Sequence, residues 1–225
     1  MTFSITGRCD RTGMFGVAIA TSSICVGSRC PHARAGTGAV ATQNITDPDL
    51  ANLVLDRLAL GDDATSAINH VIQGREHIDY RQLTAIDRNG TTSHFTGSHI
   101  LGIHASHQAS NCIAAGNLLS NDHVPTQMTK AFNALPEAHL AERLLAALEA
   151  GIEAGGEEGP VHSAALKVVD KMPFALVDLR IDWHDTDPTA QLRHLWTAYE
   201  PQMIDYLNRA INPANAPSYG VAGDR

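Results

Sequence analysis

The beginning of the chain alternates between polar and apolar residues. Thr2-Phe3-Ser4-Ile5-Thr6 has the period of two that is typical of a strand, and it predicts one over residues 2–9. A turn at residues 10–13 leads into a second strand, residues 15–21, whose side chains are apolar and mostly small. Such side chains suit a strand that packs between two layers. The same signals predict further strands over residues 24–26 (as a continuation of the second), 40–43, 81–87, 91–96, 100–104, 111–115, 163–169 and 174–180.

Helical periodicity separates these groups of strands. Asp47 and Pro48 are expected to be the N-cap and the first residue of a helix that ends near Gly61. The clearest helical stretch, residues 137–154, carries its leucines on one face before two glycines end it. The predicted helices are residues 47–61, 63–73, 125–135, 137–154 and 188–207, with a solvated loop over residues 157–160 and an irregular tail over residues 212–225.

Groups of strands between pairs of helices predict a layered α+β fold. The arrangement that buries both kinds of element is two antiparallel sheets stacked face to face, with the helices outside. The small residues of the early strands fit the inside of such a sandwich. No internal repeat or linker divides the chain, so residues 1–225 are predicted to form a single domain.

Composition narrows the class of partner. The net charge of -8 argues against nucleic acid and anionic membranes, since both favour a basic surface. No apolar run approaches the roughly 20 residues of a membrane helix, and no secretory signal is predicted at the N-terminus. The four cysteines match no paired motif, which is typical of buried thiols in a cytoplasmic protein. A homodimer is expected from the frequency of twofold assemblies.

The second residue is the first candidate for chemistry. Thr2 is small, so the initiator Met1 before it is expected to be a substrate for removal. Removal leaves a free α-amino group on the same residue as a hydroxyl. The hydroxyl can then attack a carbonyl while the neighbouring amine accepts its proton. Because an α-amine titrates near pH ~8, a useful fraction is unprotonated at neutral pH.

Three other segments carry candidate side chains. His32 and Arg34 alternate in a Gly-rich stretch, and Arg binds carboxylates through two parallel hydrogen bonds. Asn117 follows a strand and can direct its side-chain amide at an oxyanion. Ser163 opens a strand of small residues and can hydrogen-bond a catalytic amine. Structural roles are the alternatives: a loop-binding Arg, a turn-forming Asn and a strand-opening Ser.

The sequence does not require a metal or a cofactor. The acidic stretch from Asp178 to Asp187 offers oxygen ligands for a hard cation, so a metal-dependent hydrolase is an alternative. A solvated loop that caps the last helix explains the same residues more simply, with Asp187 as N-cap before Pro188. Gly36-Thr37-Gly38 lacks the further glycines and the Lys of phosphate-binding loops. We therefore expect neither a metal nor a cofactor.

Several segments, taken in order along the chain, resemble the bacterial "domain of unknown function 1028" family. The most specific is Pro-His-Ala-Arg-Ala-Gly, which begins at Pro31. The segments that carry the resemblance are residues 1–5, 31–43, 116–119, 141–148, 163–166, 178–182 and 216–220. This chain departs from the family pattern at His162, where relatives usually have Gln, and at Thr6-Gly7, where they often have a larger apolar residue.

That family in turn resembles the N-terminal nucleophile hydrolases. The resemblance implies a four-layer αββα sandwich in which the first residue after processing is the nucleophile, the place that Thr2 occupies. The family's substrate and reaction are not established, so it implies a fold and a nucleophile position only.

The combined prediction is an amidohydrolase that cleaves a small amide or acyl-amino compound. Thr2 attacks, its α-amine acts as base, Asn117 stabilises the oxyanion, and Ser163 or His162 tunes the amine. Arg34 is predicted to anchor a carboxylate of the substrate. The predicted substrate-binding residues are His32, Arg34, Gln43 and His162. The alternative is a non-catalytic protein that keeps Met1 and binds a small molecule in the same pocket.

Overall fold

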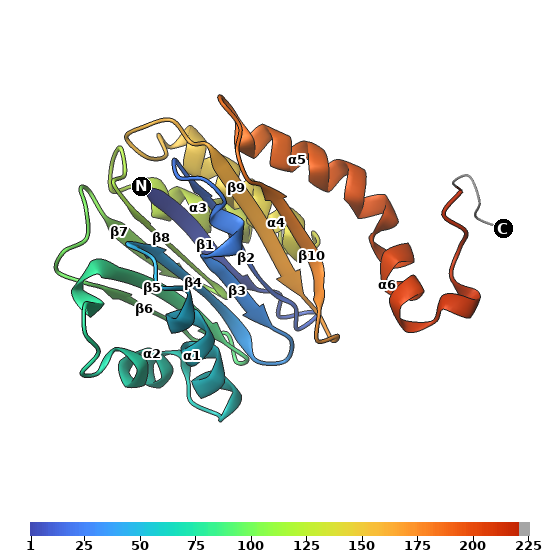
Figure 1. Ribbon diagram of the computed structural model, residues 1–225, viewed down its shortest axis with the longest axis horizontal. Helices are drawn as coiled ribbons and strands as arrows, with labels where there is room; N and C mark the ends of the chain where they lie inside the picture. Colours follow the sequence, from blue (N-terminus) through green and yellow to red (C-terminus); the bar gives the residue numbers. More distant parts are fainter. Residues whose placement is uncertain (221–225) are drawn as a thin grey trace.

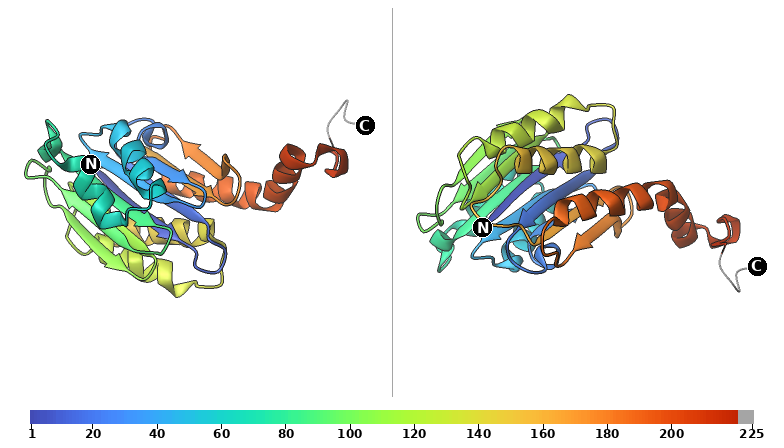
Figure 2. Two further views of the ribbon diagram at one scale, coloured as in Figure 1. Left: turned by 90° about the horizontal axis from the view of Figure 1, so that it is seen from below. Right: turned by 90° about the horizontal axis from the view of Figure 1, so that it is seen from above.

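The computed structural model describes residues 1–220, in which two antiparallel sheets are stacked (Figures 1 and 2). Within these residues, a six-stranded sheet has the order β10-β9-β2-β1-β8-β7, and a four-stranded sheet has the order β3-β4-β5-β6. The strands are β1 (Thr2–Arg8), β2 (Phe15–Thr21), β3 (Pro31–Arg34), β4 (Gly38–Asn44), β5 (Arg81–Asp87), β6 (Thr92–Thr96), β7 (Ala105–Ala109), β8 (Cys112–Asn117), β9 (Ser163–Val169) and β10 (Ala175–Ile181).

Helices cover both outer faces of this pair of sheets. The helices α1 and α2 pack on the four-stranded sheet, while α3, α4 and α5 pack on the six-stranded sheet (Figure 2). This arrangement confirms the predicted α+β class with an αββα order of layers. No helix in the described part of the chain is both long and apolar enough to cross a bilayer. The helices are α1 (Pro48–Ala59), α2 (Ala64–Ile72), α3 (Val124–Ala134), α4 (Leu140–Glu153), α5 (Pro188–Tyr199) and α6 (Met203–Ile211).

The alternation of β1 decides which layer each of its side chains contacts. Phe3 and Ile5 are fully buried in the apolar cluster that includes residues of α3 and α4. Ser4 and Thr6 point to the opposite face, where the Ser4 hydroxyl donates to Gln43 at 2.7 Å and the Thr6 hydroxyl lies 2.9 Å from that of Thr84. Since side chains two residues apart share a face of a strand, Thr2 also faces the space between the sheets.

The predicted strands differ from the structure in three places. The edge strand β3 was not predicted, because it has four residues and begins with Pro, which an edge position tolerates. Residues 100–104 were predicted as a strand but form a loop around Gly102, which has φ +60°; the strand β7 follows it. Residues 24–26 do not continue β2. They lead through Cys25, which has φ 58°, into a 3₁₀ turn over Val26–Ser28.

The last helical stretch is also interrupted. Its apolar period predicts one helix over residues 188–207, but α5 ends at Tyr199 and α6 begins at Met203, with a 3₁₀ turn between them. Pro201 lies in that turn and has no N–H to donate, which breaks the helical ladder. Figure 1 shows α6 and residues 212–220 extending away from the sheets. Of the irregular tail predicted over residues 212–225, residues 221–225 lie outside the described residues.

Candidate active site

Four polar residues form a row across the end of the six-stranded sheet. The strand register places Thr2 opposite Asn117 on one side and Thr21 on the other, and Thr21 opposite Ser163. Directly opposed residues on neighbouring strands share a face of the sheet. Because Thr2 faces the space between the sheets, the whole row does so. The row therefore brings together Thr2, Asn117 and Ser163, whose catalytic role stays a prediction, and adds Thr21.

The hydroxyls of Thr2 and Thr21 converge on one carbonyl oxygen. Both Oγ1 atoms donate to the carbonyl oxygen of Met1, and the two Oγ1 atoms lie 3.1 Å apart. Thr2 is 5% exposed, so its hydroxyl is largely shielded from solvent. The carbonyl that precedes Thr2 is thus held by two hydrogen-bond donors. Thr21 was not predicted, because a Thr at the end of an apolar strand carries no signal that distinguishes it.

A chain of buried amides fixes the orientation of Asn117. Gln82 Nε2 donates to the Gly116 carbonyl at 3.2 Å, so Gln82 Oε1 must be the acceptor at its other side. That oxygen accepts from Gln43 Nε2 at 2.7 Å and from Asn117 Nδ2 at 3.2 Å. The Oδ1 atom of Asn117 is buried and has no hydrogen-bond partner within residues 1–220. Asn117 therefore presents an acceptor oxygen and one further N–H beside Thr2.

Gln43 has a supporting position in this chain of amides. Its Oε1 accepts from Ser4 and its Nε2 donates to Gln82, so both of its polar atoms are bound to protein groups. The side chain is 1% exposed. Its predicted contact with a substrate stays a prediction, while its contacts assign it a part in holding Gln82 in place.

Ser163 holds the loop after β2. Its hydroxyl donates to the Ser23 carbonyl at 2.6 Å and accepts from the Val26 N–H at 3.2 Å. In the row it is separated from Thr2 by Thr21. These contacts favour a positioning role for Ser163 over the predicted role as a direct partner of the amine.

His162 lies at the edge of the row beside an aromatic ring. Its backbone N–H donates to the Thr21 carbonyl at 2.9 Å, and its Nδ1 lies 3.0 Å from the His184 carbonyl. The imidazole stacks on Trp183 with ring centroids 4.3 Å apart, and Trp183 is half exposed. His162 is thus fixed near the site, at a position from which a substrate can contact it.

The structure does not bring Arg34 to this site. Arg34 lies opposite Gly38, five residues along β4 from Gln43, a separation of about 17 Å along a strand. Its guanidinium binds Asp56 at 2.8 Å and the Leu55 carbonyl of α1. The predicted contact of Arg34 with a substrate carboxylate stays a prediction, while in the structure the helix α1 supplies the carboxylate and the carbonyl that its guanidinium binds.

His32 lies two residues before Arg34 on β3, so it is nearer to the site along the strand. Its Nδ1 is 3.3 Å from the Cys30 carbonyl. Burial lowers the pKa of His32, and the positive charge of Lys167 lowers it further, so the ring is neutral at pH 7. A neutral imidazole of this kind can donate or accept a hydrogen bond but supplies no charge to a ligand.

Glu157 is a buried acid that lies near Met1 in space and that the sequence pattern did not predict. Glu157 was predicted in a solvated loop, yet it is 5% exposed. Leu119 forms a β-bridge with Glu157, and the Glu158 N–H donates to the Leu118 carbonyl at 2.9 Å, so the strand-like pairing draws this loop inward. Burial raises the pKa of Glu157 to about 7, against the lowering effects of the N-terminal charge and of Ser22. No local pattern marks such an acid, because its burial comes from pairing with a distant segment.

The acidic stretch before α5 has structural partners. Asp178 binds Lys167 and Arg180, and Asp187 accepts from the Ala190 N–H at 2.8 Å as the N-cap of α5. Within residues 1–220, no three His, Cys, Asp or Glu side chains gather in a way that could hold a metal ion. The capping role predicted for Asp187 is confirmed.

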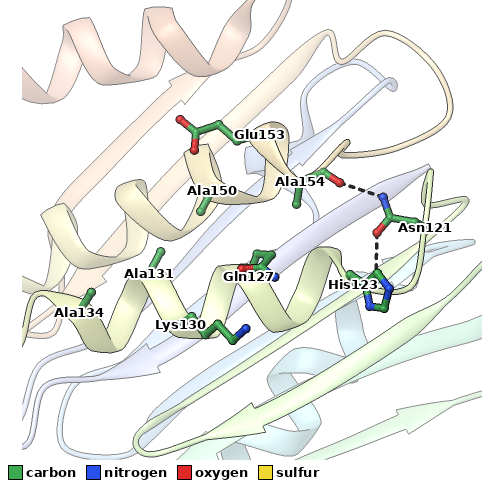
Figure 3. Close-up of a pocket in the computed structure, with 9 residues that line it drawn as sticks. All are labelled: Asn121, His123, Gln127, Lys130, Ala131, Ala134, Ala150, Glu153 and Ala154. Atoms are coloured by element: carbon green, nitrogen blue, oxygen red, sulfur yellow. Dashed lines mark hydrogen bonds between the residues drawn. The ribbon is translucent and has the colours of Figure 1, made fainter.

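A surface groove of about 660 Å³ lies between α3 and α4 (Figure 3). Asn121 stands at one end of it, where its Nδ2 donates to the Ala154 carbonyl at 2.8 Å and its Oδ1 accepts from the His123 N–H at 3.0 Å. The groove lies on the helix side of the six-stranded sheet, whereas the row around Thr2 faces the other sheet. The groove is therefore separate from the candidate active site.

Comparisons with known proteins agree with the resemblance seen in the sequence. The model of a family of unknown function, DUF1028, matches residues 2–192. The crystal structure of protein SPO2555 from Silicibacter pomeroyi, also a DUF1028 protein, is 35% identical, with a TM-score of 0.82 over 88% of each chain. No curated protein matches the chain significantly.

More distant similarity is found to Anbu, the ancestral beta-subunit. The protein from Yersinia bercovieri is 13% identical over 91% of this chain and 97% of that chain, with a TM-score of 0.41. A mutant Anbu from Hyphomicrobium sp. strain MC1 is 11% identical over 91% and 96% of the two chains, with a TM-score of 0.46. Because the family model matches most of the chain and SPO2555 is similar to it, the chain belongs to DUF1028, a family of unknown function.

Proposed function

We propose that this protein is an amidohydrolase in which Thr2 is the nucleophile once the Met1–Thr2 peptide bond has been cut. The observation that carries the proposal is the position of Thr2. It is the first residue of a central strand, it faces the space between the sheets, and it lies between Thr21 and Asn117. A strand that is paired on both sides holds such a terminus rigidly.

The reaction follows from the two groups that Thr2 then carries. The hydroxyl oxygen attacks the amide carbonyl, and the hydroxyl proton passes to the α-amine of Thr2. The tetrahedral intermediate collapses with breakage of the C–N bond, and the leaving amine takes that proton. Water then attacks the resulting ester, releasing the acid and restoring the hydroxyl. One water is consumed, and no redox partner is needed.

The neighbours of Thr2 support the charged intermediate. Thr21 donates to the carbonyl oxygen that precedes Thr2, so its hydroxyl can donate to an oxygen that binds beside Thr2. The further N–H of Asn117 is a second donor on the other side. Removing one such donor typically lowers kcat by about 100-fold to 1,000-fold. The unpartnered Oδ1 of Asn117 can accept a hydrogen bond from the α-amine.

The test requires protein whose first residue is verified as Thr2. Such protein is obtained by releasing it from an N-terminal fusion and checking its intact mass. It is then screened against acyl-amides, amino acid amides and dipeptides. We expect turnover that Thr2→Ala abolishes and Thr2→Ser partly retains, because Ser keeps the hydroxyl.

The intact mass of the native protein, together with the Thr2→Ala variant, distinguishes the alternative of a binding protein. If the native protein keeps Met1 quantitatively, the α-amine belongs to the wrong residue and this mechanism cannot operate. Turnover that survives Thr2→Ala would equally remove Thr2 as the nucleophile.

A further inference from the structure

Met1 occupies a defined place beside Thr2. Its carbonyl oxygen accepts from Thr2 and Thr21, as described above. Its side chain lies against Gly159: a Cβ built on that glycine would be 3.0 Å from Met1 Cε and 3.4 Å from Sδ. The carbonyl and the side chain of Met1 are therefore both in contact with the protein. Met1 therefore marks a space beside the Thr2 hydroxyl in which the protein contacts both a carbonyl oxygen and a side chain.

The α-amino group of Met1 lies close enough to Glu157 to affect its titration. The positive charge of the N-terminus is the largest of the effects that lower the pKa of this carboxyl against its burial. Both carboxylate oxygens are buried without a hydrogen bond of normal geometry within residues 1–220, and the hydroxyl and N–H of Ser22 lie near enough to lower the pKa of the carboxyl. A buried carboxylate is costly unless a cation is paired with it. The amino group of residue 1 is a cation that acts on this carboxyl through its charge, without an ion pair between the two among the described residues.

A cavity lies next to the space that Met1 occupies. It has a volume of about 250 Å³, and its lining includes Glu157, Gly159, Val161 and Thr189. Glu157 and Gly159 therefore belong both to this lining and to the surroundings of Met1.

We infer that the space now filled by Met1 is the acyl subsite of the enzyme, and that it takes an aminoacyl group whose free α-amino group binds Glu157. The substrate class is then an α-aminoacyl amide with an unbranched apolar side chain, such as an amino acid amide or a short peptide with a free N-terminus. This inference rests on the proposed function. It adds Glu157 as the residue that selects the amino group and Gly159 as the residue that sets side-chain size.

Matched substrates test the amino group. Protein beginning at Thr2 is assayed with L-methionine p-nitroanilide and with its N-acetyl derivative, which differ in whether the amine can carry charge. We expect kcat/KM to favour the free amine by about 100-fold or more, because a site built to bind a polar group rejects an analogue that lacks it. Glu157→Gln should reduce that preference to within about tenfold and raise KM for the free amine.

Two variants separate specificity from stability. Glu158→Gln removes the charge of the exposed neighbouring acid and should keep the preference of the unmodified protein. Gly159→Ala places a methyl group against the position of Met1 Cε. It should lower kcat/KM for the methionyl substrate by about tenfold relative to L-alanine p-nitroanilide, since overpacking disfavours the larger group.

A binding measurement distinguishes failure of this inference from failure of the proposed function. L-methioninol, which has the free amine but no amide bond, is titrated into protein beginning at Thr2, with N-acetyl-methioninol as control. Binding that needs both the amine and Glu157 supports the subsite even if no amide is hydrolysed. Hydrolysis of amides without preference for the free amine would overturn the subsite and leave the hydrolase. Absence of both turnover and amine-dependent binding would overturn both.

Discussion

The hydroxyl oxygens of Thr2 and Thr21 lie 3.1 Å apart and donate to the same carbonyl oxygen, that of Met1. The two residues are directly opposite each other on β1 and β2, so the register of a hairpin sets this distance. Under the proposed function, the pair combines the nucleophile with a hydrogen-bond donor for the carbonyl oxygen of the substrate. The other feature of the site is the Oδ1 atom of Asn117, which has no hydrogen-bond partner within residues 1–220. Its orientation depends on the hydrogen bond from Asn117 to Gln82.

The Thr21 hydroxyl should matter for catalysis more than for folding. In protein beginning at Thr2, Thr21→Val keeps the shape of the side chain and removes the donor to the substrate oxygen. We expect kcat for an amide substrate to fall by about 100-fold to 1,000-fold. Steady-state kinetics measures this. The matched control is the double variant Thr6→Val with Thr84→Val, which removes the deeper hydroxyl pair and should leave kcat unchanged. Equal losses in both variants would contradict a specific role for Thr21.

Replacing Gln82 should greatly reduce the stability of the fold, because its side chain links the buried amides. Gln82→Leu leaves Gln43 Nε2, Asn117 Nδ2 and the Gly116 carbonyl without their buried partner. Each buried group left unsatisfied costs about 1–3 kcal/mol, so with three such groups the free energy of unfolding should fall by about 3 kcal/mol or more. Urea unfolding measures the change. Gln191→Leu, at an exposed position of α5, should change it by less than about 0.5 kcal/mol. A small effect at Gln82 would show that water replaces the missing amide.

The raised pKa of Glu157 predicts a pH dependence of stability in protein that keeps Met1. A carboxyl whose pKa is higher in the folded state stabilises the fold below its unfolded pKa, and this contribution is lost as pH rises through the folded value. Burial raises the pKa of Glu157 from 4.5 to about 7. Between pH 4.5 and 7.5, the stability of the unmodified protein should therefore fall relative to Glu157→Gln, by up to about 3 kcal/mol.

Urea unfolding of both proteins at the two pH values checks this. Glu158→Gln, which changes an exposed acid, should follow the unmodified protein at both. Parallel pH profiles for Glu157→Gln and the unmodified protein would mean that the carboxyl is not desolvated in solution.

An ion-pair cluster should hold α5 against α4. Arg193 donates through Nε and Nη2 to Glu149, at 2.8 Å and 2.7 Å, and through Nη1 to Glu142, at 2.5 Å. These groups are about one-third exposed, so solvent screens them. Arg193→Gln should lower the free energy of unfolding by about 1–2 kcal/mol, and less at 1 M salt. Arg11→Gln, which loses a more exposed and longer pair with Glu137, should change it by less than about 0.5 kcal/mol. If the effect of Arg193→Gln on the free energy of unfolding did not depend on salt, an electrostatic role would be contradicted.

Sequence pattern alone determined the features that depend on neighbours in the chain. The caps at Asp47 and Asp187 each accept from an N–H two or three residues away, so composition around the helix start was enough to predict them. The period of two at Thr2–Thr6 likewise predicted the strand β1 and its two faces. The position of Thr2 at the start of that strand followed from the same local pattern.

Tertiary structure alone decided which side chains surround Thr2. Thr21 and Asn117 are its neighbours because of strand register, and Arg34 is occupied because α1 brings Asp56 to it. Glu157 is buried because its loop pairs with Leu119, a contact between distant segments. Such contacts depend on how the strands and loops pack in three dimensions, and no periodicity within a short window carries that information.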